Sequence, residues 1–536
     1  MSYLPTIQHL AENPEALEQT YQQAVKSGEQ AAFAEAVEAA RADAPANLLL
    51  AAWHYRLIGA AAAVKKRVIA WGWALPLGLL NGLLLWLLSD DQRFTIRFTN
   101  PLNGQVYSLF PAVLLLAAPV SAVLIALFLA LAGKRRPGRA VAVGLGLAAG
   151  AAYVLLLFPR MWPRLFQEQY LGLMALHLGL LAWAGVGAVA LARGDDREGR
   201  FAFLVKSLEA FVVGGLLAIA GGLFTAITFG LFNALGIQPP DWAVRLFAAG
   251  GGGLIAVVAV ALVYDPAAAA REQSFDEGLS RLVALLLRLL LPLAVAVLVV
   301  YLGFIPFNWR EPFENRDVLM VFSGLLFAVV ALLIGATPVH GAELSERAQT
   351  WLRRGVIALA GLTLLVGLYA LAAILYRTAN GRLTPNRLLF IGWNVVNIIL
   401  LAVVLIGQAR AGRTRWLEAM RQAFAVGIAL YLAWAAIGLL APPWLFRGAP
   451  ADVAGLPESV QYVLYERADP ILLKCDRSPH IYLLEGGQKR WIRDIPTLTA
   501  AGYRWSDVVT WVSCEDLRSV PDGIPIPPDA GPPPMP

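Results

Sequence analysis

The sequence predicts an all-α polytopic membrane protein of about 11 transmembrane helices, with an N-terminal cytosolic helical region and a small C-terminal α+β module. The chain of 536 residues is 58% hydrophobic and 15% charged, whereas soluble domains are about 45–50% apolar. Apolar runs of about 20 residues recur along most of it, the length that a helix needs to cross a bilayer. The final part instead alternates apolar and polar residues around a Gly-Gly turn, which is typical of a β-hairpin. The composition therefore excludes a soluble protein, and residues 65–441 are predicted to be the transmembrane domain.

Residues 1–64 are predicted to form a cytosolic helical cap. Three segments, 17–25, 31–41 and 46–58, carry apolar residues at helical spacing. Their lengths and their Ala, Leu and Tyr pattern resemble tetratricopeptide-like hairpins. Because one such unit is too small for a solenoid, two interpretations fit: a cap that packs on the membrane face, or a peptide-binding repeat.

Eleven apolar segments are predicted to span the membrane. No short apolar run with a cleavage site precedes them, so the first span is expected to act as the insertion signal. The predicted spans cover residues 68–88, 107–132, 139–158, 171–192, 207–235, 245–264, 283–305, 318–336, 355–376, 388–408 and 422–441.

The distribution of basic residues predicts the orientation. If the N-terminus is cytoplasmic, the inner connections carry 20 lysines and arginines and the outer connections carry 10. Basic residues are enriched on the cytoplasmic side of membrane proteins. We therefore expect a multi-pass protein of the bacterial cytoplasmic membrane, in contact with the lipid bilayer, with its N-terminus inside and its C-terminal module outside. The net charge of +6 follows from these connections and does not indicate a nucleic-acid partner.

The predicted C-terminal module covers residues 470–527, between a linker at 442–469 and a proline-rich tail at 528–536. Two strands are expected on either side of a Gly486-Gly487 turn. Asp494 is expected to cap a short helix that follows the second strand.

Two sets of side chains in this module are candidates for a special role. Cys475 and Cys514, the two cysteines of the chain, are predicted to form a disulfide that closes a loop of about 40 residues and contributes about 3–4 kcal/mol. Two unpaired buried thiols are the alternative. Tyr482, Trp491 and Trp505 are either an aromatic surface for a ligand or rings of a small core.

The order of motifs in the module also resembles a small module of exported bacterial proteins, most closely from Chloroflexota-type bacteria. The resemblance implies a position outside the membrane and names no ligand; an envelope polymer or an envelope protein is the expected partner. The matching residues are Tyr482, Leu483, Gly487, Lys489, Arg490, Trp491, Ile492, Gly502, Tyr503, Trp505, Asp507, Val508, Pro521 and Gly523.

The transmembrane segments resemble the bacterial membrane family called domain of unknown function 4153, over roughly residues 65–440. The chain departs from the family pattern at Asn380, where a tyrosine is usual, and at the inserted Arg382. Because the activity of that family is unknown, the resemblance implies a helical membrane fold and no catalytic residues. The matching positions are Pro292, Leu293, Tyr301, Arg377, Gly381, Leu383, Thr384, Asn386 and Arg387.

Polar residues in and beside the spans are the candidate binding residues. Arg377, Arg382 and Arg387 place three cations at one outer turn, where they either bind an anionic lipid headgroup or extend to the membrane surface from helix ends. His177 and Asn394 lie within spans, where polar groups either serve function or join helices by hydrogen bonds.

No motif of an enzyme is present. The chain has no H-E-x-x-H, P-loop or G-x-S-x-G motif, and we expect no cofactor and no metal. The leading interpretation is a non-enzymatic, envelope-associated protein for sensing, scaffolding or lipid handling. The alternative is a transporter or a lipid-modifying enzyme with a site between the helices, lined by His177, Arg377 and Asn394. A polar cavity at the membrane midplane would favour the alternative, and a filled bundle would favour the first.

Overall fold

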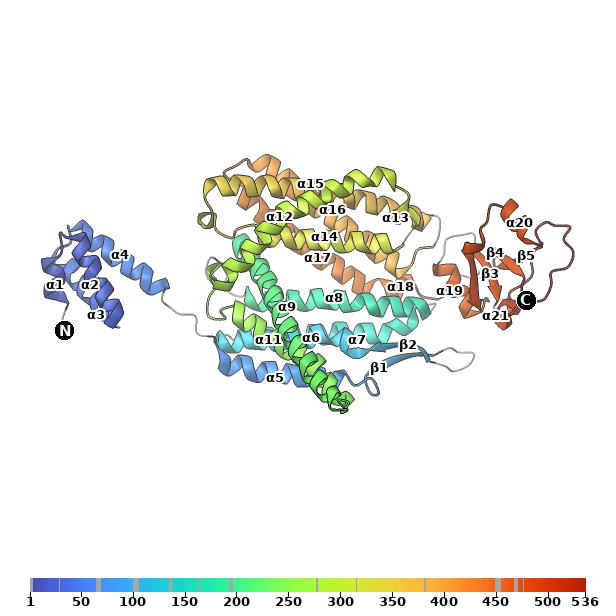
Figure 1. Cartoon of the computed structure of the whole chain (residues 1–536), viewed down its shortest axis with the longest axis horizontal. Coiled ribbons are helices and arrows are strands. Elements are labelled where there is room, and N and C mark those ends of the chain that lie inside the picture. Colours follow the sequence, from blue (N-terminus) through green and yellow to red (C-terminus); the bar gives the residue numbers. More distant parts are fainter. Residues whose placement is uncertain are drawn as a thin grey trace. The chain divides into compact units, whose positions relative to one another are not determined.

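The structure is a computed structural model that describes most of the chain (Figure 1). Met1–Ile69 and Ala70–Pro536 form two compact units. The described residues are 3–27, 29–63, 69–99, 106–134, 137–161, 164–191, 196–275, 278–314, 316–379, 382–448, 455–466, 471–475 and 477–536.

The N-terminal unit contains four helices: α1 (Leu4–His9), α2 (Pro14–Ser27), α3 (Gln30–Asp43) and α4 (Leu48–Ala63). The three segments expected from the sequence lie in α2, α3 and α4. The short α1 was not predicted, because six residues are too few to show a helical repeat. It adds Ile7 to a buried core that includes Leu17, Phe33, Val37, Leu50 and Trp53.

Eleven helices of the described chain are long and apolar enough to cross a membrane, which confirms the predicted number and the predicted fold class. Nine begin and end as α5 (Trp71–Leu88), α6 (Ala112–Ala132), α7 (Gly138–Leu157), α8 (Arg164–Ala190), α9 (Arg197–Ala234), α12 (Gly278–Phe304), α15 (Glu346–Ala379), α16 (Pro385–Ala411) and α17 (Trp416–Leu440). The other two are α14 (Arg316–Ala336) and α11 (Gly251–Val263), which α10 (Asp241–Arg245) and the turn η2 (Leu246–Gly250) extend at its start.

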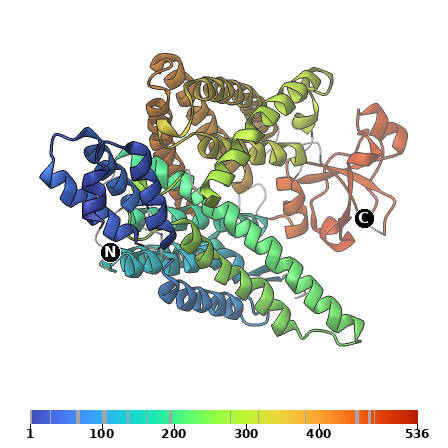
Figure 2. The ribbon, with the colours of Figure 1, turned by 60° about the vertical axis from the view of Figure 1, so that its left-hand side comes forward.

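The spans form two neighbouring groups. In the first, α6 packs against α5 and α8, and α11 packs against α5 and α9; in the second, α15 packs against α12, α14 and α16, and α16 packs against α17. Contacts of α17 with α8 and of α14 with α9 join the groups. The 38-residue α9 is about 57 Å long, longer than the roughly 30 Å hydrocarbon layer. Figure 2 shows it running beside α11, and its apolar side chains, such as Leu223, are exposed, as expected for contact with lipid.

A β-hairpin after the first span was not predicted. Strand β1 (Thr95–Thr99) pairs antiparallel with β2 (Val106–Pro111). The second span, expected from residue 107, therefore begins at Ala112. From Leu109 onward the apolar residues of β2 continue into the span without a polar residue, which hid this boundary in the sequence.

The C-terminal module is built on a four-stranded sheet. The strands are β3 (Ile471–Cys475), β4 (Ile481–Glu485), β5 (Gln488–Ile492) and β6 (Val508–Val512), in the order β5-β4-β3-β6. The predicted hairpin is present as β4 and β5, with Gly486 at φ 59° and Gly487 at φ 77°, a backbone conformation that favours glycine. Strand β6 pairs with β3 in parallel.

Short helices complete the module. Asp494 caps α20 (Ile495–Ala500) as expected, since its carboxylate accepts from the Thr497 amide at 2.8 Å. Helix α19 (Glu458–Glu466) packs against β6 and α21 (Cys514–Ser519), with Val460 and Val463 buried. Because α19 lies within 442–469, the segment predicted as a linker includes an element of the module.

The predicted disulfide is present. Cys475 ends β3, Cys514 begins α21, and their Cα atoms lie 4.9 Å apart, within the range of about 4.4–6.8 Å for a bonded pair. The bond ties an inner strand of the sheet to the last helix. The tail also packs on the module, because the Tyr482 hydroxyl donates to the Pro534 carbonyl at 2.7 Å.

Candidate functional site

The two polar residues predicted within the spans, His177 and Asn394, are fully buried between helices. His177 is fully buried on α8, and its Nδ1 lies 2.8 Å from the Leu173 carbonyl. Its ring centroid is 5.5 Å from that of Trp393, and a Cβ added to Gly438 would come within 2.5 Å of its Nε2. The absence of a side chain at Gly438 therefore lets α17 approach α8 at His177.

Asn394 and its neighbours join α16 to the adjacent helices. The Asn394 amide donates to the Phe390 carbonyl at 2.8 Å and lies 3.4 Å from the Ser323 hydroxyl of α14. One turn further along α16, the Asn397 carbonyl accepts from the Tyr431 hydroxyl of α17. Arg377, the third residue of the predicted intramembrane site, belongs to the last turn of α15 and has no described contact with His177 or Asn394.

In the turn between α15 and α16, which the sequence predicts to be outside, an arginine side chain helps to fix the backbone of the turn itself. Thr384 caps α16 through the Arg387 amide, at 3.2 Å, as its position before Pro385 predicts. The Arg387 guanidinium donates to the Arg382 carbonyl at 2.6 Å. Asn380 and Gly381 lie outside the described residues. Anion binding by Arg377, Arg382 and Arg387 stays a prediction.

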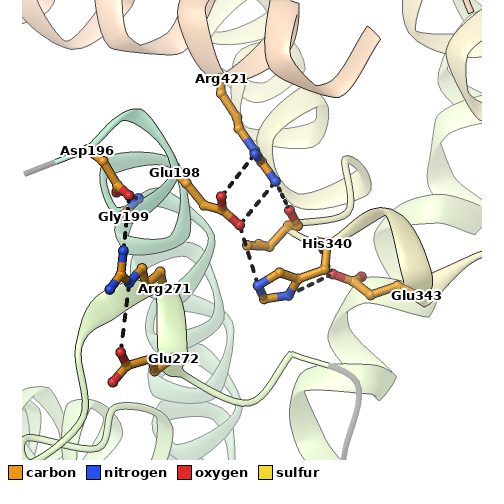
Figure 3. Close-up of polar contacts among 9 residues, drawn as sticks. Asp196, Glu198, Gly199, Arg271, Glu272, His340, Glu343 and Arg421 are labelled. Carbon is orange, nitrogen blue, oxygen red and sulfur yellow. Dashed lines mark hydrogen bonds and ion pairs between the residues drawn. The ribbon is translucent and has the colours of Figure 1, made fainter. Parts of the chain in front are cut away.

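The sequence did not predict a cluster of charged residues that Figure 3 shows. The cluster lies at the ends of the spans opposite to the α15–α16 turn, where basic residues are most numerous. The Arg421 guanidinium of α17 binds both carboxylate oxygens of Glu198, in the first turn of α9, at 3.1 and 3.2 Å. It also donates to the Val339 carbonyl at 2.6 Å. His340 lies between two carboxylates, 3.6 Å from Glu198 and 3.9 Å from Glu343. The two parallel contacts between Arg421 and Glu198 form a bidentate pair, which is strong and directional.

The cluster continues into α12 and α9. Arg288 of α12 pairs with Glu343 at 2.9 Å. In α9, the Lys206 ammonium and the Glu209 carboxylate lie 2.8 Å apart, with side chains only 2% and 5% exposed, and both contact the Ser280 hydroxyl. These charges are compensated within the protein, which suits a structural clamp that joins α9, α12, α17 and the segment from Val339 to Glu343. No group of metal-binding type is found among the described residues.

A cavity within the first group of spans is apolar. It has a volume of about 260 Å³ and lies between α6, α8, α9 and α11. Most of its lining is aliphatic, and the Trp183 indole in its wall already donates to the Ser207 hydroxyl at 3.0 Å. Its polar lining side chains are few, and the Lys206 ammonium among them is already paired with Glu209 at 2.8 Å.

The C-terminal module contains an open pocket of about 470 Å³. The Trp505 ring, 54% exposed, stands at its edge, whereas Tyr482 is fully buried in the core and Trp491 is partly buried against it. Of the three aromatic residues singled out in the sequence, Trp505 is thus the one best placed to contact a ligand. The basic side chains that line the pocket are Lys474, Arg477, His480 and Arg493.

Among the lining residues that the structure describes, the one acidic side chain is already occupied. Asp494 accepts hydrogen bonds from Thr497 and lies 3.3 Å from the Arg493 guanidinium, and these contacts lower its carboxyl pKa below the usual value. The remaining basic groups give the pocket a positive character that suits an anionic ligand.

No family model, curated protein or solved structure matches this chain. The fold and the sites therefore define its class, a multi-pass helical membrane protein with a disulfide-bonded α+β module.

Proposed function

We propose that this protein is a non-enzymatic component of the cell envelope, in which a bundle of spans holds the C-terminal module on the outer side of a bacterial cytoplasmic membrane for sensing or scaffolding. The observation that carries the proposal is the pocket of the module, which combines an exposed Trp505 ring with several basic side chains. A disulfide in the same module suits an oxidising compartment.

The membrane domain supports the same interpretation. Its polar side chains at His177, Asn394 and Asn397 lie in helix contacts, and its charged cluster is paired internally. Such a bundle supplies a rigid anchor. The bilayer around it contacts the exposed apolar side chains of the spans.

The ligand class follows from the lining of the pocket. Aromatic faces bind the flat faces of sugars and other ring compounds, and arginine or lysine binds carboxylate or phosphate. We therefore propose an acidic sugar polymer of the envelope as the ligand.

The test measures binding of an oligosaccharide of glucuronic acid to the full-length protein in lipid nanodiscs, with a neutral glucose oligomer of the same length as the comparison. The acidic oligomer should bind more tightly, and binding should weaken in Trp505→Ala and in Lys474→Gln. Arg504→Gln is the matched control, because this neighbouring arginine is largely exposed and does not line the pocket. Equal binding of the acidic oligomer by the native chain and both pocket variants would contradict the proposal.

A further inference from the structure

The helices α16 and α17 form a hairpin with an open groove along one side, of about 490 Å³. On α16, the lining residues recur at helical spacing and end with Arg410 and Ala411, the last two residues of the helix. On α17, they begin near Arg415, which immediately precedes the helix. The complete lining is Val403, Ile406, Gly407, Arg410, Ala411, Arg415, Glu418, Ala419, Gln422, Ala423 and Val426.

The groove is polar at one end and apolar at the other. Arg410 and Arg415 flank the connection between the helices, where both spans end. Val403 lies two helical turns, about 10 Å, into the span from Arg410, and Val426 lies about three turns into the span from Arg415. Ile406 and Val426 are 50% and 40% exposed. This gradient runs from the membrane surface toward the membrane interior.

Charge sets the polar end of the groove apart from the neighbouring charged cluster. Arg421, one turn into α17, is neutralised by Glu198. Neither Arg410 nor Arg415 forms an ion pair with a residue that the structure describes. Glu418 also lines this end, so the three ionisable groups together carry one net positive charge.

We propose that this groove binds a phospholipid with an anionic headgroup, with its phosphate at Arg410 and Arg415 and an acyl chain along Ile406 and Val426. Arginine binds phosphate oxygens through its planar fork of donors, and apolar side chains at membrane depth suit a hydrocarbon chain. The order of polar and apolar groups along the groove matches the order along a lipid molecule. This site is separate from the outer turn at Arg387 and independent of the ligand of the C-terminal module.

The test counts lipids that stay bound to the full-length protein in native mass spectrometry, after addition of phosphatidylglycerol or of phosphatidylcholine with the same acyl chains. Each surface arginine contributes about a 5-fold gain in affinity for an anionic membrane lipid, so Arg410→Gln with Arg415→Gln should weaken phosphatidylglycerol binding about 30-fold. Phosphatidylcholine binding should change little. Arg413→Gln is the matched control, since this arginine lies in the same connection and does not line the groove.

A second variant tests the apolar end without changing charge. Ile406→Asn should also weaken phosphatidylglycerol binding, because an amide would face the acyl chain. Unchanged binding in the double arginine variant, or an equal loss in Arg413→Gln, would overturn the site. Displacement of phosphatidylglycerol by millimolar inorganic phosphate alone would indicate a free-anion site and would overturn the lipid assignment. Size-exclusion chromatography of each variant confirms that the chain remains folded.

Discussion

Loss of the Cys475–Cys514 bond should destabilise the C-terminal module while the membrane domain stays folded. The two residues are 39 positions apart, and in the chain-entropy model a loop of this size stabilises by about 4 kcal/mol. A single small core seldom supplies more than about 3–5 kcal/mol. Cys475→Ser with Cys514→Ser should therefore remove about half of the stability of the module.

Proteolysis of the full-length chain in detergent measures this change. When opening and closing are fast, the cleavage rate follows the population of the open form, and about 4 kcal/mol corresponds to about a thousandfold increase. Dithiothreitol should raise the cleavage rate of the native chain and leave the double variant unchanged. Equal cleavage of the native chain and the double variant, with the bond confirmed in the native chain, would refute the reasoning that the bond stabilises the module.

Three other predictions concern packing, charge and pH. Gly392→Ala should lower the melting temperature of the detergent-solubilised chain, because an added Cβ would overlap the Trp434 ring and overpacking costs about 1–3 kcal/mol. Gly361→Ala is the control and should leave the melting temperature unchanged, because its added Cβ would meet no atom within 4 Å. A double-mutant cycle on Glu198 and Arg421 should show a coupling of about 1–3 kcal/mol, and additive effects would contradict the paired geometry. Burial raises the pKa of Tyr482 from 10.0 to about 12, so its contribution to module stability is complete below pH 10 and is lost as the pH rises through 12. Near-ultraviolet circular dichroism should show this loss in the native chain and not in Tyr482→Phe.

The spans could be predicted from the sequence because their signal is local. A chain in hydrocarbon must satisfy its backbone hydrogen bonds within each helix, so each span is a single apolar run that can be read without knowledge of its neighbours. The hairpin of β4 and β5 was equally local, since Gly486 and Gly487 mark its turn. Strand β2 was missed because its apolar residues join the next span.

The elements and sites that were missed depend on residues far apart in the chain. Strand β6 pairs with β3 although the β4–β5 hairpin lies between them in the sequence. Parallel strands are not joined by a tight turn, so no local sequence signal predicts this pairing. Glu198 and Arg421 are 223 residues apart, so the charged cluster appears only when the helices assemble. The residue types alone could not show which aromatic side chains are buried and which are exposed. Tyr482 is buried in the core, whereas Trp505 lies exposed at the edge of the pocket.

We propose that the C-terminal module lies outside the cytoplasmic membrane while the N-terminus lies inside. An odd number of crossings would place the two ends on opposite sides of the membrane, and the bias in basic residues predicts that the N-terminus is inside. The most direct measurement compares two fusions at the C-terminus in cells, one to alkaline phosphatase and one to green fluorescent protein. With the C-terminus outside, the phosphatase should be active and the fluorescent protein dark. An inactive phosphatase and a bright fluorescent protein would contradict this orientation.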